Sequence, residues 1–311
     1  MKALHMNPML SVFRQSEHSR KGLAGIGFGL ITAAIWGAFI AVSRQGIGAG
    51  LQAADLAFLR YLSAGLILLP WLLRQKISSL AGIGWPQGLL LSFLAGPAFV
   101  MVGASGYLFA PLAHGAVIQL GTLTLLTVVL ATCLLKEPLG LQRGAGVLIL
   151  VCGLIVTAGP TLFQAGSSAW RGDILFACAG AMWALFSILM RRWQVNALAA
   201  TAVVSVLSAL IYTPLWLIFA SVQRLQNVPL WLVIEQVVVQ GILSGVVALF
   251  CFSRAVNLLG ASRAALFPAL APGAAILIGI PLTGDIPTVM QVLGLLIVSS
   301  GLLVTVIKWR K

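Results

Sequence analysis

Long stretches without charge constrain this chain more than any other feature. No Asp, Glu, Lys or Arg occurs between Lys76 and Lys136, and charge-poor windows fill most of the remaining sequence. Only 8% of the chain is charged and 60% is hydrophobic, whereas about a quarter of a typical soluble domain is charged. The composition therefore excludes a soluble enzyme, a disordered protein and a disulfide-rich secreted domain. It predicts an all-α polytopic membrane protein.

The charge-poor windows divide into ten predicted transmembrane helices, because a helix of about 20 apolar residues crosses a bilayer. The first window is longer than the apolar core of a signal peptide and lacks a small-residue cleavage site, so we expect it to be retained. The predicted spans lie near residues 22–47, 54–73, 86–109, 114–135, 141–158, 173–191, 199–221, 231–253, 262–282 and 288–308.

Basic residues sort between alternate loops. Fifteen Lys and Arg fall in the termini and the even-numbered loops, whereas the odd-numbered loops hold three, Arg44, Arg171 and Arg224, beside Asp55, Asp173 and Asp285. Because cytoplasmic loops are enriched in Lys and Arg, this split predicts a plasma (bacterial inner) membrane protein with both termini cytoplasmic. The net charge of +13 is then an orientation signal and predicts no nucleic-acid partner.

The two halves of the sequence resemble each other. Residues 146–156 (GVLILVCGLIV) align with residues 294–304 (GLLIVSSGLLV), and the same offset of 148 places Glu137 on Asp285. At an offset of 147, Trp36 falls on Trp183. Each half has five predicted spans, so the second half enters the membrane from the opposite side, as in the inverted repeats of secondary transporters. We expect a tail (1–21), a first repeat (22–158), a connecting loop (159–172), a second repeat (173–308) and a short end (309–311).

Three features together resemble a known family. They are the run Glu137-Pro138-x-x-x-Gln142-x-x-x-Gly146, the start Phe58-Leu59-Arg60 of span two, and an Ala-rich span nine that ends near Asp285. The chain is similar to the EamA-type transporters of the drug/metabolite transporter superfamily, although the second copy has Asp285 and Ile286 where the first has Glu137 and Pro138.

The resemblance implies ten helices around a central cavity that opens to one side at a time. It implies export or import of a small metabolite, and we expect a secondary transporter that works as an exporter. The alternative is a non-transporting membrane protein, such as a lipid-handling or assembly factor, that keeps the transporter fold.

Arg60 is the first candidate for a substrate-binding residue. It lies inside span two, where a charge costs about 2.5–3.5 kcal/mol at the centre of the membrane. Such a residue faces a cavity or a partner, so Arg60 is predicted to bind an anionic substrate. The structural alternatives are that it reaches the outer interface or pairs with nearby Asp55.

Other candidates come from unusual residues inside spans. Trp36 and Trp183 occupy equivalent places in spans one and six and are either cavity walls or packing residues; the other tryptophans are expected in an interfacial belt. Pro268 and Pro272 should kink span nine and free carbonyls that can line a cavity. The remaining candidates are Tyr61, Gln119 and Thr122, of which the last two share a helix face and either bind substrate or join helices.

Several residue types are expected to have structural roles. The four cysteines have no paired spacing and are expected to be small buried hydrophobes, so no disulfide, metal site or cofactor is predicted. Ser105 lies in a Gly-x-Ser-Gly sequence, but His114, the single histidine of the membrane region, is only nine residues downstream and no later span has a histidine, so catalysis is not predicted. His114 is expected at a solvated turn, with proton coupling as the alternative. Glu137 and Asp285 are expected to cap helices, with a role in gating as the alternative. The fifth and tenth spans are predicted to be peripheral, where they could form a homodimer.

Overall fold

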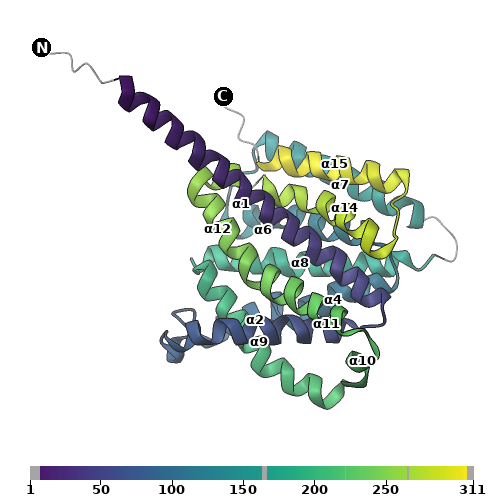
Figure 1. Ribbon diagram of the computed structural model, residues 1–311. Helices are drawn as coiled ribbons and strands as arrows, with labels where there is room; N and C mark the ends of the chain where they lie inside the picture. Colours follow the sequence, from purple (N-terminus) through teal and green to yellow (C-terminus); the bar gives the residue numbers. More distant parts are fainter. Residues whose placement is uncertain (1–7, 163–166, 221, 265, 307–311) are drawn as a thin grey trace, which may run out of the picture.

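The computed structural model describes residues 8–162, 167–220, 222–264 and 266–306 (Figure 1). Every regular element in these ranges is helical. The first repeat contains α1 (Pro8–Gly48), α2 (Ala53–Leu73), η1 (Ile77–Ser79), α3 (Trp85–Ala95), α4 (Pro97–Ser105), η2 (Gly106–Leu108), α5 (Leu112–His114), η3 (Gly115–Gln119), α6 (Leu120–Leu135) and α7 (Leu141–Leu162). The second repeat contains α8 (Ala169–Arg192), α9 (Ala197–Phe219), α10 (Val222–Asn227), α11 (Leu230–Gln236), η4 (Val237–Val247), α12 (Ala248–Leu259), α13 (Ala261–Ala264), η5 (Phe267–Leu270), α14 (Ala271–Thr283) and α15 (Val289–Val306).

These elements form the ten predicted transmembrane helices. In the described part of the chain, eight helical segments are long and apolar enough to cross a membrane, and two shorter apolar helices, Phe267–Thr283 and Val289–Thr305, complete the set. Four boundaries differ from the prediction by four residues or more. Helix α1 already begins at Pro8, and the eighth span continues to Leu259 through the charged residue Arg254. Helix α7 runs to Leu162 and α8 begins at Ala169, both inside the predicted connecting loop.

Helix packing follows a two-fold pattern that exchanges the repeats. Helix α1 packs against α14 and α12, and its counterpart α8 packs against α6 and α4. Helix α2 contacts η4 while its counterpart α9 contacts α3. The remaining two large contacts, α2 with α9 and α7 with α15, each join a helix to its own counterpart. These contacts confirm the inverted repeat.

Helices α7 and α15 pair through the glycines that the repeat aligned. A Cβ on Gly153 would lie 3.1 Å from the carbonyl oxygen of Gly294, and a Cβ on Gly301 would lie 3.0 Å from that of Gly146. Two backbones approach this closely only when no side chain stands between them, the packing mode of small residues in membrane helices. The two helices lie together along one edge of the bundle (Figure 1).

The third and fourth spans of each repeat are interrupted, whereas the fifth is continuous. Span three breaks at Gly96 between α3 and α4, and span four contains the π-helical turn η3. Their counterparts contain the longer π-helical segment η4 and the 3₁₀ segment η5, which carries Pro268. Interruptions of this kind leave backbone groups free of the regular α-helical pattern.

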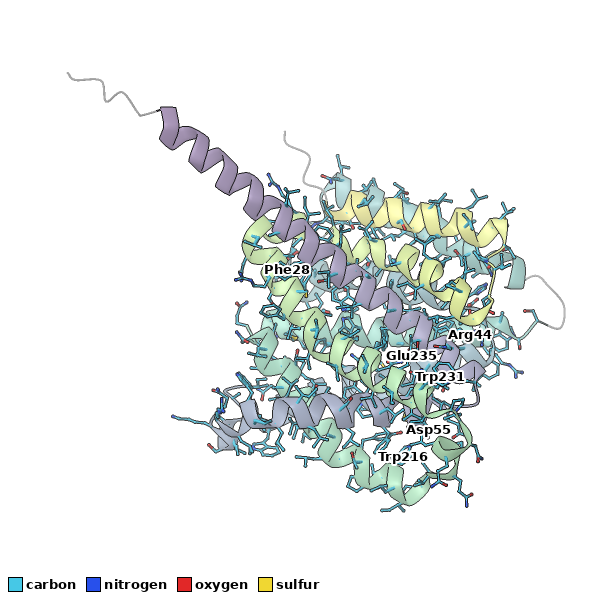
Figure 2. The ribbon with its side chains drawn as sticks, in the orientation of Figure 1. Phe28, Arg44, Asp55, Trp216, Trp231 and Glu235 are labelled. Carbon is cyan, nitrogen blue, oxygen red and sulfur yellow. The ribbon has the colours of Figure 1, made fainter. Side chains whose placement is uncertain are left out.

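The ion pairs that link the two repeats lie at the two ends of the bundle. We call the end that holds the start of α1 and the end of α15 the proximal end, and the opposite end the distal end. Arg44, Asp55, Trp216 and Glu235 lie toward the distal end, far from Phe28 (Figure 2).

Candidate functional site

A buried polar cluster lies where α1, α2 and the eighth span meet. We call it the Arg60 cluster; it consists of Ser43, Arg60, Gln236, Gln240 and Ser244. Arg60 Nη1 donates to the carbonyl oxygen of Gln240 and to Ser244 Oγ, both at 3.1 Å. Gln240 Nε2 donates to Ser43 Oγ at 2.9 Å and to Gln236 Oε1 at 3.1 Å. Two of these residues belong to the first repeat and three to the second, so the cluster joins the repeats.

Arg60 has no acidic partner in the part of the chain that the structure describes. Its side chain is buried, with the residue 7% exposed, and its Nε makes no hydrogen bond. The guanidinium carbon lies 4.8 Å from the centre of the Phe39 ring and 5.5 Å from that of Tyr61. Aromatic faces stabilise a cation but leave its net charge uncompensated. The cluster is therefore a buried site of positive charge with an unused donor.

Local packing explains how the cluster forms. Arg60 is the eighth residue of α2, about 10 Å from the helix start at 1.5 Å per residue. A Cβ on Gly241 would lie 1.7 Å from Ser63 Oγ and 3.1 Å from the carbonyl oxygen of Arg60. Only glycine lets η4 lie this close to α2, and the close approach brings the Gln240 carbonyl within reach of the guanidinium.

The aromatic candidates pack between the repeats. Trp36 on α1 contacts Phe252 on α12 with ring centres 5.6 Å apart, and Trp183 on α8 contacts Phe99 on α4 at 4.9 Å. Each tryptophan thus lies against the third span of the other repeat. Both are half-buried. Tyr61 is buried and its hydroxyl donates to the carbonyl oxygen of Ala95 at 2.5 Å, which ties α2 to α3.

The remaining candidates lie on the fourth and ninth spans. Gln119 lies against Gly103, and Thr122 lies against Gly180 of α8. Neither side chain makes a hydrogen bond within the described residues. Pro268 is half-buried in η5, and Pro272 is buried at the start of α14. The candidates are therefore not gathered in one site: within the described ranges, no hydrogen bond or ring contact joins Arg60 to Trp36, Gln119, Thr122 or Trp183.

Three charged contacts link the repeats at the distal end. Arg44 Nε donates to Asp285 Oδ2 at 2.8 Å, and Asp285 also accepts from the backbone N–H of Leu112 at 3.3 Å. Asp55 accepts from Trp216 Nε1 at 3.0 Å and from Arg224 Nε at 3.2 Å. His114 Nδ1 lies 2.7 Å from Asp173 Oδ1. In each contact one partner comes from either repeat.

A related contact lies at the proximal end. Arg143, on the following helix, and Arg191, at the end of α8, both donate to Glu137. These two hydrogen bonds, the one from Arg143 first, lower the pKa of Glu137 below its ordinary value of 4.5. Arg191 lies 147 residues after Arg44, and Asp285 lies 148 after Glu137. The Arg44–Asp285 and Arg191–Glu137 pairs are therefore equivalent positions of the two repeats.

Several expectations about individual residues prove wrong. Asp55 pairs with Arg224 and not with Arg60, because both partners lie at the distal helix ends while Arg60 points to the eighth span. His114 is fully buried, and Trp216 is buried against Phe58 with ring centres 3.9 Å apart instead of lying in an interfacial belt.

The predicted capping acids and buried cysteines also need correction. Glu137 and Asp285 form ion pairs with arginines. Cys133, Cys152 and Cys178 are exposed on the bundle surface and only Cys251 is buried, all four being free thiols. In a membrane the outer surface of the bundle is itself apolar, so an apolar residue need not be buried.

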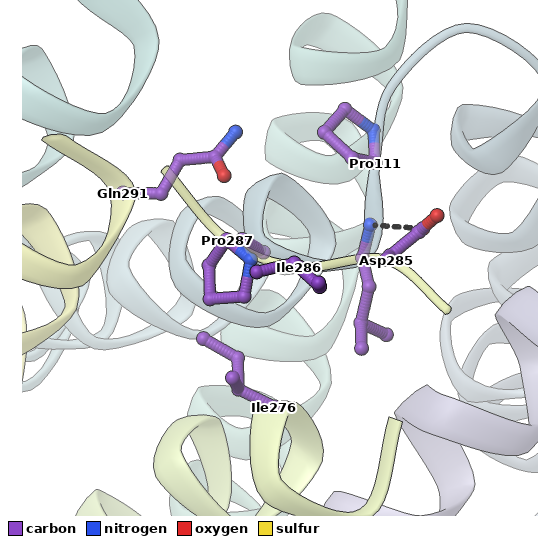
Figure 3. Close-up of a pocket in the computed structure, with 8 residues that line it drawn as sticks. Pro111, Ile276, Asp285, Ile286, Pro287 and Gln291 are labelled. Atoms are coloured by element: carbon purple, nitrogen blue, oxygen red, sulfur yellow. Dashed lines mark hydrogen bonds between the residues drawn. The ribbon is translucent and has the colours of Figure 1, made fainter. Parts of the chain in front are cut away.

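A small cavity lies beside Asp285 at the distal end. It is lined by Pro111, Ile276, Ile286, Pro287 and Gln291 among others (Figure 3) and encloses about 10 Å³. That volume holds at most about one water molecule. The cavity is therefore too small for a metabolite.

Comparisons with known proteins agree with this architecture. A solved structure described only as a crystal structure of a protein aligns over 92% of this chain and 96% of its own, with a TM-score of 0.57 and 18% sequence identity, which shows a shared fold. No curated protein matches the sequence. The model of the EamA-like transporter family matches twice, over residues 23–159 and 170–307. Since these matches cover most of the chain in two copies, the protein belongs to the EamA-like transporter family and is an integral membrane transporter.

Proposed function

We propose that this protein exports a small anionic metabolite, such as a carboxylate, from the cytoplasm by alternating access. The observation that carries the proposal is the buried guanidinium of Arg60, which lies between the repeats without an acidic partner in the described chain. A buried charge is costly unless it is paired. A substrate carboxylate would supply the missing charge and accept from the free Nε.

The neighbouring residues suit a small substrate with polar and apolar parts. Gln240 Oε1 is buried without a partner and could accept from a substrate hydroxyl or amine. Trp36 lies about one helical turn before Phe39 on α1, so both rings lie on the same side of that helix. Because Phe39 contacts the Arg60 guanidinium, Trp36 would line the approach to Arg60. Gln119, Thr122, Trp183, Pro268 and Pro272 would form the opposite wall once the halves separate.

The equivalent ion pairs would act as the two gates. Arg44–Asp285 ties the end of the first helix of one repeat to the loop before the fifth helix of the other repeat, and Arg191–Glu137 does the same with the repeats exchanged. A motion that exchanges the conformations of the repeats would break one pair while keeping the other. The interrupted third and fourth spans supply the places where such a motion can bend the helices.

Charge supports the direction of transport. We place the proximal end in the cytoplasm because most basic residues lie there, including the exposed Arg254 and Arg263. These residues attract anions from that side. An anion that leaves a cell with a negative interior gains about 2.3 kcal/mol per charge per 100 mV, so export would need no coupled ion.

Ligand-dependent stability and flux test the proposal. Purified protein is screened for thermal stabilisation by amino acids, hydroxy acids, sugar acids and matched amines, and each stabilising compound is assayed for potential-driven flux in proteoliposomes. We expect carboxylates to stabilise the wild type and Arg171→Gln, a control at an exposed arginine, but not Arg60→Gln. Stabilisation by amines alone, or carboxylate binding that survives Arg60→Gln, would refute the assigned substrate class. Binding without flux would favour a non-transporting protein of the same fold.

A further inference from the structure

The contact between His114 and Asp173 differs from the other distal ion pairs because it is buried and titratable. His114 is fully buried and the Asp173 side chain is 10% exposed. His114 Nδ1 and Asp173 Oδ1 are 2.7 Å apart, whereas His114 Nε2 and Asp173 Oδ2 make no hydrogen bond. The Arg44–Asp285 pair, in contrast, is about a quarter exposed on both sides.

The position of the pair makes it sensitive to movement of the repeats. His114 ends α5 in the first repeat, directly before the π-helical turn η3, and Asp173 lies in the first turns of α8 in the second repeat. The neighbouring Gly172 brings the two together: a Cβ there would lie 2.7 Å from the carbonyl oxygen of Gly106. The contact therefore exists only while the distal ends of the fourth and sixth spans touch.

No other charge nearby balances the pair. The charged and titratable side chains around it are Arg44 on α1, Tyr107 on η2, Arg171 on α8 and Asp285 before α15. Arg44 donates to Asp285 and to the carbonyl oxygen of Tyr107, and Arg171 is exposed over the Trp170 ring. Within the described residues none of them bonds to His114 or Asp173. The net charge of the buried pair is therefore decided by a single proton.

We propose that His114 and Asp173 form a proton-binding site that controls closure of the distal end. With the imidazole protonated on both nitrogens, the pair has no net charge, which favours its burial in the apolar contact over the burial of a lone carboxylate. When that proton leaves to water, a carboxylate remains with one hydrogen bond from a neutral imidazole, and a buried unpaired charge is costly. The deprotonated pair therefore favours separation of the two spans, which hydrates the carboxylate.

The proton is exchanged with water when the two spans separate. In the closed contact Asp173 lies at the edge of an open groove of about 270 Å³ whose other lining side chains are apolar, among them Ile118, Leu154 and Trp170. Separation of the spans would expose the carboxylate to water. The proton comes from the distal aqueous phase and returns to it, and no other bond changes. This inference rests on the alternating access proposed above and adds a regulator to it.

A reporter thiol in nanodiscs tests the proposal without any substrate. Ala169→Cys is placed in a background in which the four native cysteines are serine. Ala169 is buried at the start of α8, one turn before Asp173 and on the same helix face. Its reaction rate with a membrane-impermeant maleimide is divided by that of Ser168→Cys, an exposed neighbour, which removes the intrinsic pH dependence of the thiol.

The expected result is a rise of this ratio from pH 5.5 to 8.5, by up to about tenfold per pH unit, because one proton is linked to closure. Asp173→Asn removes the charge and should keep the ratio low at both pH values, whereas His114→Gln leaves the carboxylate unpaired and should raise it at both. The double variant should return to the low ratio.

Two outcomes would overturn the proposal. A wild-type ratio that does not change with pH would show that no proton is linked to closure. A rise in both single variants would show that the pair acts only as a structural hydrogen bond. Because the reporter needs no ligand, failure here is distinguishable from failure of the carboxylate-binding experiment on Arg60.

Discussion

Breaking the two equivalent ion pairs should shift the transporter in opposite directions. In the distal pair, Arg44 donates to both carboxylate oxygens of Asp285 and to the carbonyl oxygen of Tyr107, and both charged side chains are 24% exposed. Hydrogen bonds to charged groups contribute about 1.5–3 kcal/mol when buried. Discounted for partial exposure, the loss in Arg44→Gln is about 1–2 kcal/mol. The population with an open distal end should rise by about 5- to 30-fold.

The proximal pair is weaker because it is more exposed. The side chains of Glu137 and Arg191 are 27% and 51% exposed, and surface pairs contribute about 0.2–1 kcal/mol. Glu137→Gln should therefore open the proximal end by only about 1.4- to 5-fold. The distal substitution should have the larger effect, although the two pairs occupy equivalent positions in the repeats.

Reporter cysteines at the two ends measure both shifts. Ala113 is buried beside Asp285 at the distal end, and Ala131 is buried in the last turns of α6 at the proximal end. While opening is fast relative to labelling, the maleimide reaction rate of each cysteine follows the open population. Arg44→Gln should accelerate labelling at Ala113→Cys but not at Ala131→Cys, and Glu137→Gln should do the reverse. Equal acceleration of both reporters in either variant would mean general loosening and would refute the gate assignment.

Three further predictions follow from individual contacts. Gly153→Ala and Gly301→Ala should each destabilise the protein by about 0.5–2 kcal/mol, measured by unfolding in detergent. In both variants the new Cβ lies 2.8 Å from the backbone of the facing helix. The control Gly144→Ala, whose Cβ meets nothing within 4 Å, should be neutral or stabilising. Tyr61→Phe should lower stability by about 0.5–1.5 kcal/mol through loss of the bond to Ala95 while flux persists, and lost flux in a folded variant would instead assign Tyr61 to the substrate. Because the folded protein lowers the pKa of Glu137 below 4.5, its contribution is complete above that value and is lost on acidification through the lowered pKa. The difference in melting temperature between wild type and Glu137→Gln should therefore be constant near neutral pH and shrink below about pH 4.5, and a difference that grows on acidification would contradict this sign.

The sequence predicts the spans and the repeat well because both depend on local patterns. Charge-free windows mark helices whatever they pack against, and an odd number of spans per half determines the inversion. The packing role of the glycines in the repeat is visible only in the structure. Gly146 and Gly153 align with Gly294 and Gly301 in sequence, but the structure pairs them crosswise, as an antiparallel two-fold contact requires.

The Arg60 cluster could be predicted only in part. The sequence predicts Arg60 from its charge inside a span. Its contact with Gln240 depends on Gly241 and on the π-helical segment η4, which bring two distant helices together. Asp55, which was one alternative partner, is closer to Arg60 in sequence, but it lies at the helix start, where its carboxylate forms a capping box with Gln52 and meets Arg224. Sequence distance thus indicated the wrong partner.

The charges of the odd-numbered loops indicate the orientation of the protein, and in the structure they also form contacts between the repeats. Three acids and three arginines balance one another in these loops, which agrees with a face outside the cytoplasm. In the structure Asp285 and Asp55 pair with Arg44 and Arg224 across the repeats, while Asp173 takes His114 and leaves Arg171 exposed. The third pair differs from the other two. The arginines of the first two pairs are permanently charged, whereas His114 carries a positive charge only with a bound proton. The buried His114–Asp173 pair is therefore electrically neutral only when His114 is protonated, which is the physical basis for the proposed proton control of the distal gate.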